Sequence, residues 1–320
     1  MKYQVVSIKY LIVLCFLSIL YTLYLIPHTA YAEGVNLQIQ PATLQIRAIT
    51  PADVKAPFTI ENAGANPVTL RIVLSRFRDN GDGLGKPVYT NAFTQADTDE
   101  FLNNIQILDE ETAVDTLVLG PQQSKQLTLA IPLLKESKKQ DHYFSVVFLS
   151  ENEDQPASPE GNNTAMSTIK TAIALPVLLS INQDNQKTGF LKTFSAPVFL
   201  QEGPVPFTVE AQNVGDHFIT ARGVILIRNM FGQTVGRIEI PKTNILAGSS
   251  RISPKVIWDE PFLFGIYHAT LSLSFFPEQS LYTYSISFVA FPLVALVGFV
   301  VVLLLLLFLI LRVRKRMAHE

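Results

Sequence analysis

The chain has 320 residues, of which 48% are hydrophobic and 16% charged, with a formal net charge of −2. Residues 33–287, about 255 in number, are ample for two domains with cores of their own. The near-neutral total hides an asymmetry, because residues 33–287 keep 19 Lys and Arg against 26 Asp and Glu, a formal charge of −7. Such an acidic body argues against nucleic acid or an anionic surface as a partner, because neither would attract it by charge.

The first 32 residues have the pattern of a secretory signal peptide. Lys2 and Lys9 come before an apolar run over 11–26, and Ala30 and Ala32 are small residues at the positions that a signal peptidase reads. An uncleaved membrane anchor is the alternative. Removal of 1–32 also removes Cys15, the only cysteine, so the mature chain has no disulfide and its core must be large enough by itself.

Short strands separated by turn signals predict an all-β fold. Apolar and polar residues alternate over 35–46, where Pro41 indicates an edge strand. Further strands are predicted near 56–64, 68–75, 116–131 and 141–150, and one or two strands around Pro176 within 164–181. We therefore expect two tandem immunoglobulin-like β-sandwich domains, at 33–182 and 183–287, joined with limited flexibility.

An internal repeat supports two similar units. Pro206 to Glu210 (PFTVE) restates Pro57 to Glu61 (PFTIE), and an Asn and a Gly follow each motif before the next strand. The first unit is longer, which we assign to an insertion at 79–109 that includes a short helical pattern within 93–107. The order of the landmarks is the same in both units.

The loop from Asp79 to Gly85 (DNGDGLG) is acidic and rich in glycine, which suggests calcium. An EF-hand-type loop has Asp or Asn at its third and fifth positions. This loop has Gly81 and Gly83 there. We therefore predict a surface turn and no metal site, and keep a calcium-dependent adhesin or enzyme accessory module as an alternative function.

No catalytic or cofactor motif is found in the exported part of the sequence. Its three histidines, His142, His217 and His268, stand alone in or beside predicted strands, where a packed or surface role is typical. There is no nucleophile elbow and no phosphate-binding glycine loop. We predict that the protein is not an enzyme and has no cofactor.

A run of aromatic residues near the end of the second unit is the candidate partner-binding site. Trp258 is the only tryptophan, and indole rings serve both as binding hot spots and as sandwich core. Phe262, Leu263 and Phe264 follow in a loop, where polar residues are expected. If exposed, these rings form an apolar patch that needs a partner, which the other domain could supply.

The last apolar stretch, Phe288 to Leu311, has twenty-four residues without a charge and precedes Arg312, Arg314, Lys315 and Arg316. It is long enough to cross a bilayer core of about 30 Å as a helix. A buried core helix is the alternative. The cluster of cations predicts that residues 312–320 form a cytoplasmic tail, which places the β-domains outside a plasma membrane crossed once.

The order of these features resembles the bacterial WxL-interacting cell-surface proteins. The resemblance lies in Leu119 to Leu127 (LGPQQSKQL), Gln212 to His217 (QNVGDH), Ile245 to Ser250 (ILAGSS) and Phe264 to Ala269 (FGIYHA). It implies tandem immunoglobulin-like domains before a C-terminal transmembrane helix, a first domain that binds peptidoglycan and a second that binds host or partner proteins. The chain departs from the pattern at 135–141, where relatives carry a turn rich in Pro and Gly.

We therefore expect a non-enzymatic, membrane-anchored cell-surface protein that recognises a wall polymer (peptidoglycan) or another exported protein. The main alternative is an extracytoplasmic assembly chaperone or scaffold that offers a strand edge to a client, in the mode of β-strand addition. The segments 35–46 and 164–181 are the candidate edges.

Overall fold

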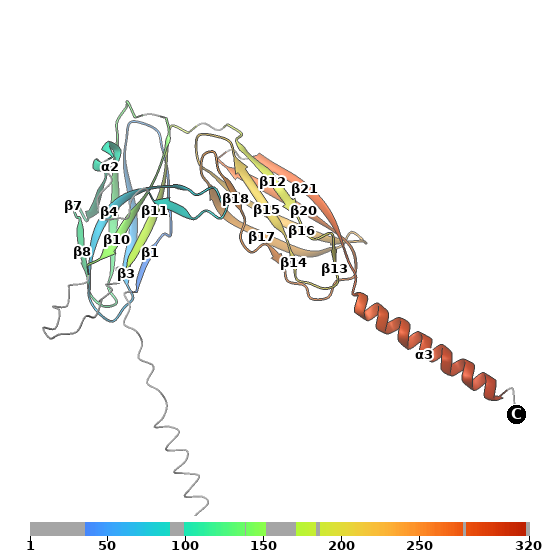
Figure 1. The fold of residues 1–320 in the computed structure, drawn as a ribbon. Helices are drawn as coiled ribbons and strands as arrows, with labels where there is room; N and C mark the ends of the chain where they lie inside the picture. The colour runs from blue at the N-terminus through green and yellow to red at the C-terminus, as the bar shows by residue number, and fades with distance from the viewer. Residues whose placement is uncertain are drawn as a thin grey trace, which may run out of the picture.

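The computed structural model describes residues 36–89, 99–137, 139–151, 171–183, 186–277 and 280–317, without the side chains at 280, 294, 295, 313 and 315–317. The chain is almost entirely β-structure, as predicted. Two groups of sheets lie one after the other, followed by a long helix, α3 (Figure 1). The predicted signal peptide, the loop predicted within 152–170 and the last residues of the predicted tail, 318–320, lie outside the described residues.

The first group of sheets, which we call the N-terminal sandwich, consists of two sheets that share one core. One sheet has the order β1 (Leu37–Gln40), β3 (Ala52–Asn62), β9 (Ser124–Leu133), β6 (Gln106–Asp109) and β7 (Thr112–Ala113). The other has the order β2 (Leu44–Ala48), β11 (Ala172–Ile181), β10 (Asp141–Ser150), β4 (Val68–Asp79) and β5 (Pro87–Tyr89), with β8 (Thr116–Leu119) also paired to β4.

The second group, the C-terminal sandwich, has its own core. Its larger sheet has the order β13 (Phe199–Leu200), β21 (Ser280–Ala290), β20 (Gly265–Phe276), β16 (Ile219–Asn229) and β17 (Thr234–Ile245). The facing strands are β12 (Gly189–Ser195), β15 (Thr208–Asn213) and β18 (Ser250–Ile252), beside the pair β14 (Val205–Pro206) and β19 (Ile257–Trp258).

Alternation along each strand decides which face is buried. In β9, Leu127, Leu129 and Ile131 are fully buried, whereas the residues between them are partly exposed. Side chains of a strand point to opposite faces in turn, so this pattern places one face on the core. β10 is an exception, because Phe144 to Phe148 are all buried, although only Phe144, Val146 and Phe148 belong to the core.

The region predicted as an insertion contributes to the sheets. Two strands, β5 and β6, lie within 79–109, and β6 pairs with the core strand β9. The predicted helical pattern is present as one turn, α2 (Glu100–Asn103), which is capped by the Asp99 side chain. Sequence comparison of the two units marked these residues as extra, but their apolar side chains Leu102, Ile105 and Ile107 join the core.

The internal repeat appears in each sandwich as a buried asparagine whose side chain binds three backbone carbonyl groups, which we call the asparagine clasp. Asn62 donates from Nδ2 to the carbonyl oxygens of Asn66, Leu119 and Gly120 at 2.7–3.4 Å. Asn213 donates in the same way to the carbonyl oxygens of His217, Ile245 and Leu246 at 2.8–3.1 Å. Each Oδ1 accepts from the glycine two residues later, Gly64 or Gly215, at 3.0 Å. One side chain thus satisfies backbone groups from two turns in each unit.

The helix α3 (Leu293–Met317) begins later than the apolar run predicts. Phe288 to Ala290 complete β21, and Phe288 is 1% exposed within the C-terminal core, stacked on Tyr267. The predicted start at Phe288 was therefore wrong, because the last strand and the helix are both uncharged and the sequence has no charge to separate them. From Leu296 to Leu311 the large apolar side chains are 41–63% exposed.

Within the part of the chain that the structure describes, no helix satisfies both the length and the hydropathy required of a membrane span.

We expect Asn213→Ala to lower the free energy of unfolding of the C-terminal sandwich by about 3 kcal/mol, because two buried carbonyl groups and a part-buried one lose their donor. Urea titration of the full chain, followed by the emission of Trp258, measures this loss. The exposed Gln201 in the same sandwich is the control, and Gln201→Ala should leave the midpoint in place. An Asn213→Ala midpoint equal to that of the control would contradict the clasp.

Candidate functional site: a strand edge and an aromatic end

The two sandwiches meet in a small apolar joint. Phe218 from the C-terminal sandwich is fully buried against Phe77 and Leu178 of the N-terminal sandwich. Tyr89, Tyr143 and Leu246 pack around them. This third apolar cluster is separate from the two cores, and it fixes one sandwich against the other.

Asp141, the first residue of β10, is the polar centre of this joint. Its carboxylate accepts hydrogen bonds from the Tyr143 hydroxyl at 2.6 Å and from the backbone N–H of Phe218, and His217 Nδ1 lies 2.7 Å from Oδ1. Ser180 Oγ is also 2.8 Å from His217 Nδ1. Burial and the neighbouring carboxylate raise the pKa of Tyr143 above its usual range. A buried carboxylate needs several such partners to offset its desolvation.

Arg47 from β2 covers the other side of the joint. Its guanidinium lies 4.3 Å from the centre of the Phe218 ring and 4.9 Å from that of Phe276, and its Nε donates to Gln183 Oε1 at 3.0 Å. Desolvation lowers the pKa of Arg47, which the nearby Asp141 charge partly offsets. The guanidinium thus stacks on two aromatic rings as a cation–π contact.

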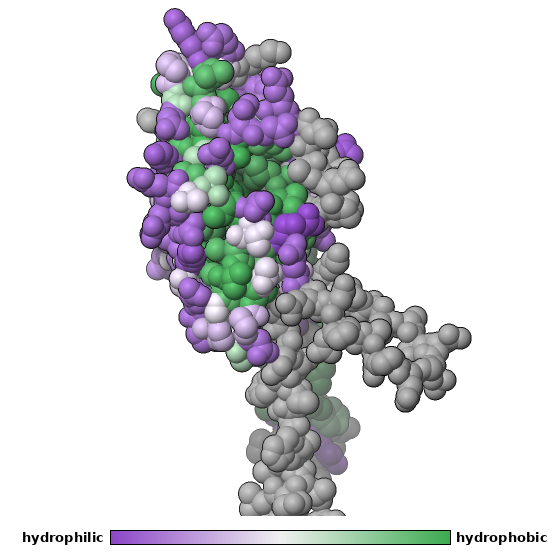
Figure 2. All heavy atoms as spheres, turned by 90° about the vertical axis from the view of Figure 1, so that its left-hand side faces the viewer, coloured by the Kyte–Doolittle hydropathy of each residue, from purple (hydrophilic) through white to green (hydrophobic). Residues whose placement is uncertain are grey.

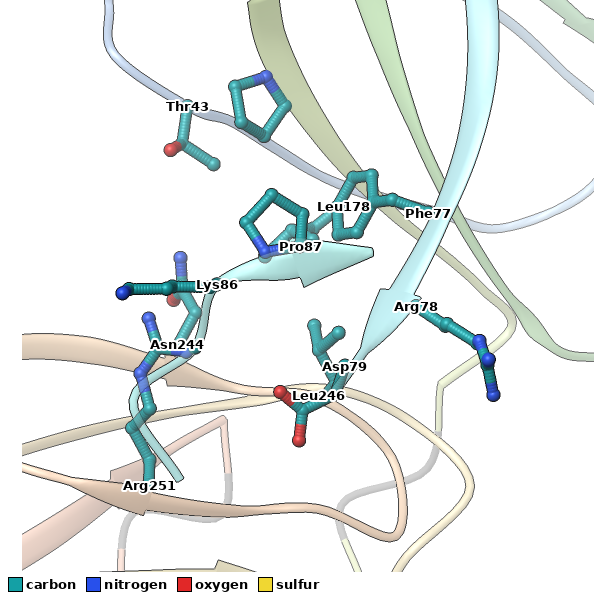
Figure 3. Close-up of a pocket in the computed structure, with 12 residues that line it drawn as sticks. Thr43, Phe77, Arg78, Asp79, Lys86, Pro87, Leu178, Asn244, Leu246 and Arg251 are labelled. Atoms are coloured by element: carbon teal, nitrogen blue, oxygen red, sulfur yellow. The ribbon is translucent and has the colours of Figure 1, made fainter. Parts of the chain in front are cut away.

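A crevice opens beside the joint, between the β4–β5 hairpin and the C-terminal sandwich (Figure 3). Its walls carry Lys86, Pro87, Leu178, Asn244 and Arg251. Its volume is about 130 Å³, well below the roughly 300 Å³ at which ligand pockets begin. We regard it as a by-product of the joint, because it is small and its three cations, Arg78, Lys86 and Arg251, share it with a single carboxylate, Asp79.

The loop from Asp79 to Gly85 closes one end of the joint. Asn80 and Asp82 bond each other, and the N–H of Leu84 donates to Asp82 Oδ1 at 2.7 Å. These local bonds lower the pKa of Asp82. The Gly83 carbonyl accepts from the N–H of Ile252 in the C-terminal sandwich at 2.9 Å. The loop is therefore a turn with a contact role, and the described residues contain no group of three His, Cys, Asp or Glu suited to a metal.

The first half of β11 has an open edge. The N–H of Ser150 donates to the carbonyl of Thr171 at 2.9 Å, and antiparallel pairs alternate between bonded and non-bonded positions. The backbone groups of Ile173 and Leu175 therefore face β10, and those of Ala172 and Ala174 face away from it. On that side β2 pairs with β11 only from Val177 onward, so no described strand pairs with Ala172 and Ala174.

The edge strand β1 lies close to this open edge across the sandwich. The same alternation, set by the bond from Ala63 N–H to the Asn36 carbonyl at 2.8 Å, turns the backbone groups of Leu37 and Ile39 away from β3. Their side chains and that of Ile173 are only partly buried against the core. Two open strand edges thus border an apolar seam.

The seam lacks the charges that protect other edges. No residue of β1 or of Ala172 to Pro176 is charged, whereas the long edge strand β17 carries Arg237, Glu239, Pro241 and Lys242. Natural proteins place charges and prolines on exposed edges to prevent pairing with other chains. An uncharged open edge is therefore a candidate for β-strand addition.

The opposite side of the N-terminal sandwich also shows an apolar strip (Figure 2). A shallow depression there is lined by Ile72, Leu74, Ile105, Ile107 and Val114. The neighbouring edge of β4 is largely occupied, because β8 and β5 pair with it and the Ile72 N–H donates to the Asp115 carbonyl at 2.8 Å. This strip offers apolar surface but little free backbone.

The predicted partner-binding residues divide into two pairs. Trp258 and Leu263 are buried, at 8% and 1% exposure, where Trp258 packs edge-to-face on Tyr267. Phe262 and Phe264 are exposed, at 69% and 54%. They lie at the end of the C-terminal sandwich where α3 begins. Their role in binding a partner remains a prediction, as does the calcium-dependent alternative.

Two of the three histidines are buried. His142 stacks on Phe101 with ring centres 3.7 Å apart, His217 belongs to the joint, and His268 is exposed beside Ser287 Oγ at 2.8 Å.

The sequence did not predict the joint between the sandwiches, because neither Asp141 nor Phe218 belongs to a motif. A carboxylate at the start of an otherwise apolar strand was the available signal.

No protein-family model matches the chain, and no curated protein matches it. Solved structures with a similar arrangement include one titled as a chaperone–tip adhesin complex of CFA/I fimbriae (TM-score 0.37, 10% identity, 80% of this chain and 98% of that one). The Escherichia coli chaperone DraB has a TM-score of 0.36 and 10% identity, over 79% of this chain and 98% of that one. A Salmonella enterica SafA pilin–SafB chaperone complex has a TM-score of 0.34 and 7% identity, over 80% of this chain and 97% of that one. At these scores the similarity adds nothing to the argument about function.

His142 gives the chain a pH-dependent stability. Burial, together with Arg76, lowers its pKa from 6.5 to about 4, although Asp99 and Asp141 act in the opposite direction. The unfolded chain therefore binds a proton more tightly, so stability falls as the pH drops from about 6.5 to 4.

We expect His142→Gln to reduce this acid loss by on the order of 1–2 kcal/mol, after allowance for solvent screening. Denaturant titrations of both proteins at pH 7.5, 5.5 and 4.5 measure the difference, and His268→Gln, which changes an exposed histidine, is the control. Parallel pH profiles for the parent protein and His142→Gln would refute the assignment.

Proposed function

We propose that this chain is a membrane-anchored, non-catalytic binding protein that takes up an extended segment of another exported protein on the open edge of β11. The observation that supports this most is the pair of outward-facing backbone residues, Ala172 and Ala174, beside an uncharged apolar seam. This is the chaperone or scaffold alternative among the functions expected from the sequence.

An incoming strand would extend the sheet beyond β11. Main-chain hydrogen bonds to Ala172 and Ala174 would supply affinity, and alternate side chains would enter the seam beside Leu37, Ile39 and Ile173. Pro176 has no N–H and would end the pairing on the side where β2 takes over. The site therefore suits a short segment with apolar residues at every second position.

The anchor in this proposal is α3, and it rests on the sequence of that helix, since no helix among the described residues meets the length and hydropathy criteria of a span. The sequence from Leu293 to Leu311 has nineteen residues without a charge, which at 1.5 Å per residue give about 28 Å, close to a bilayer core. Its exposed apolar side chains have no cover within the described chain. Arg312 and Arg314 would then lie on the cytoplasmic side, the sandwiches outside, and the division into two immunoglobulin-like domains would follow the two cores.

A wall polymer is the other partner that the sequence suggests, on the pattern of the WxL-interacting proteins. A peptidoglycan ligand would use sugar-binding side chains and would not depend on the backbone N–H of a strand edge. This difference separates the two functions experimentally.

Ala174→Pro removes one outward N–H and leaves the pairing with β10 in place, because that N–H does not face β10. We expect a photo-crosslinker at position 172 of the full chain, in the cells that produce it, to capture an exported polypeptide. Ala174→Pro should lower the crosslink yield at least about tenfold, because the edge loses a main-chain hydrogen bond and the strand geometry that pairing needs. The matched control is Ala174→Ser, which keeps the N–H.

The same proteins are tested for retention on isolated peptidoglycan. Equal retention of all variants on peptidoglycan, with no crosslinked polypeptide, would replace our proposal by wall binding. An equal crosslink yield for Ala174→Pro and Ala174→Ser would show that a partner approaches β11 without pairing to its edge, which also contradicts the proposal.

A further inference from the structure

Exposed aromatic and sulfur-containing side chains gather at one end of the C-terminal sandwich. We call Met230, Phe231, Phe262 and Phe264 the apolar collar, with exposures of 45%, 79%, 69% and 54%. They line a groove of about 300 Å³ above the buried Trp258. The surfaces of soluble proteins seldom carry so many large apolar residues in one place unless the patch binds a partner or a membrane.

The collar is held in position by ordered structure. The Asn229 side chain accepts from the N–H groups of Phe231 and Gln233, both at 3.0 Å, and so fixes the turn between β16 and β17. The N–H of Phe264 donates to the Tyr267 hydroxyl at 3.0 Å. The exposed rings are therefore presented by rigid turns, and they do not belong to a loose tail.

The collar adjoins the start of α3. The Phe264 ring lies 5.0 Å from that of Phe291, which is two residues before the first residue of the helix, Leu293. Figure 1 shows α3 leaving the sandwich from this end, opposite the joint with the N-terminal sandwich. Any bilayer that holds α3 would meet this end of the sandwich first.

The charges around the collar indicate how it would bind. The only charged residue among those that line the groove is Glu260, and Asp259 precedes it in the chain. No cation lines the groove, so anionic headgroups gain no attraction there. Contact would rest on apolar burial in the interfacial zone of the bilayer, where the rings leave water.

We infer that the apolar collar rests in the outer interfacial layer of the membrane that holds α3. This inference depends on the proposed anchoring of α3 and adds a second contact to it. The collar then fixes the tilt of the C-terminal sandwich against the bilayer, and its occupant is lipid.

The test uses the full chain in a Cys15→Ala background, with one cysteine for a fluorescent label. Phe262→Cys and Phe231→Cys place the label in the collar. Leu134→Cys places it in the N-terminal sandwich, at a residue whose exposure is also 69%. Each protein is reconstituted into phosphatidylcholine vesicles that contain a lipid with a nitroxide quencher near its headgroup.

We expect labels at positions 262 and 231 to lose most of their emission, and the label at position 134 to keep its own. Flotation with the vesicles, measured on the same samples, reports the anchoring of α3 separately. Flotation without quenching at 262 and 231 would overturn the collar and leave the anchor intact. Failure to float would overturn both the anchoring of α3 and the lipid contact of the collar. Equal quenching at all three positions would show that both sandwiches lie on lipid, which also contradicts a specific contact through the collar.

Discussion

The carboxylate of Asp141 is the contact on which the arrangement of the whole molecule depends. It lies at the start of β10 and receives the Tyr143 hydroxyl, the Phe218 N–H and His217, which come from both sandwiches. Each partner offsets part of the desolvation cost of the carboxylate, so the loss of one partner leaves the buried charge incompletely compensated. The joint is therefore specific in its geometry, whereas the apolar contacts of Phe77, Leu178 and Phe218 alone would permit sliding.

Because the joint holds one relative orientation, the two candidate surfaces are kept apart. The open edge of β11 belongs to the N-terminal sandwich, and the apolar collar belongs to the far end of the C-terminal sandwich. The second half of β11 links them, since Leu178 and Ser180 face the joint while Ala172 and Ala174 form the edge. A partner bound at the edge would pair with the same strand that contacts the C-terminal sandwich.

The sequence predicted much of the fold because the determining signals are local. The alternation of apolar and polar residues predicted most of the strands. The paired PFTIE and PFTVE motifs predicted two similar units, and each unit has an asparagine clasp, Asn62 in the first and Asn213 in the second. What it missed depends on contacts between distant residues. Asp141 and Phe218 are 77 positions apart, and no local pattern relates them. The start of α3 was also misplaced, because the buried Phe288 and the exposed Leu296 are equally apolar and only packing distinguishes them.

The direct passage from β21 to α3 has a mechanical consequence. Only Phe291 and Pro292 separate the last strand from the helix, so a pull on α3 enters β21 along the axis of the strand. β21 pairs with β20 over eleven residues, from Gly265↔Ala290 to Phe275↔Ser280. A force along the strands loads these hydrogen bonds in shear, so that they must break together. The strand next to α3 is therefore arranged to resist tension that is applied through the helix.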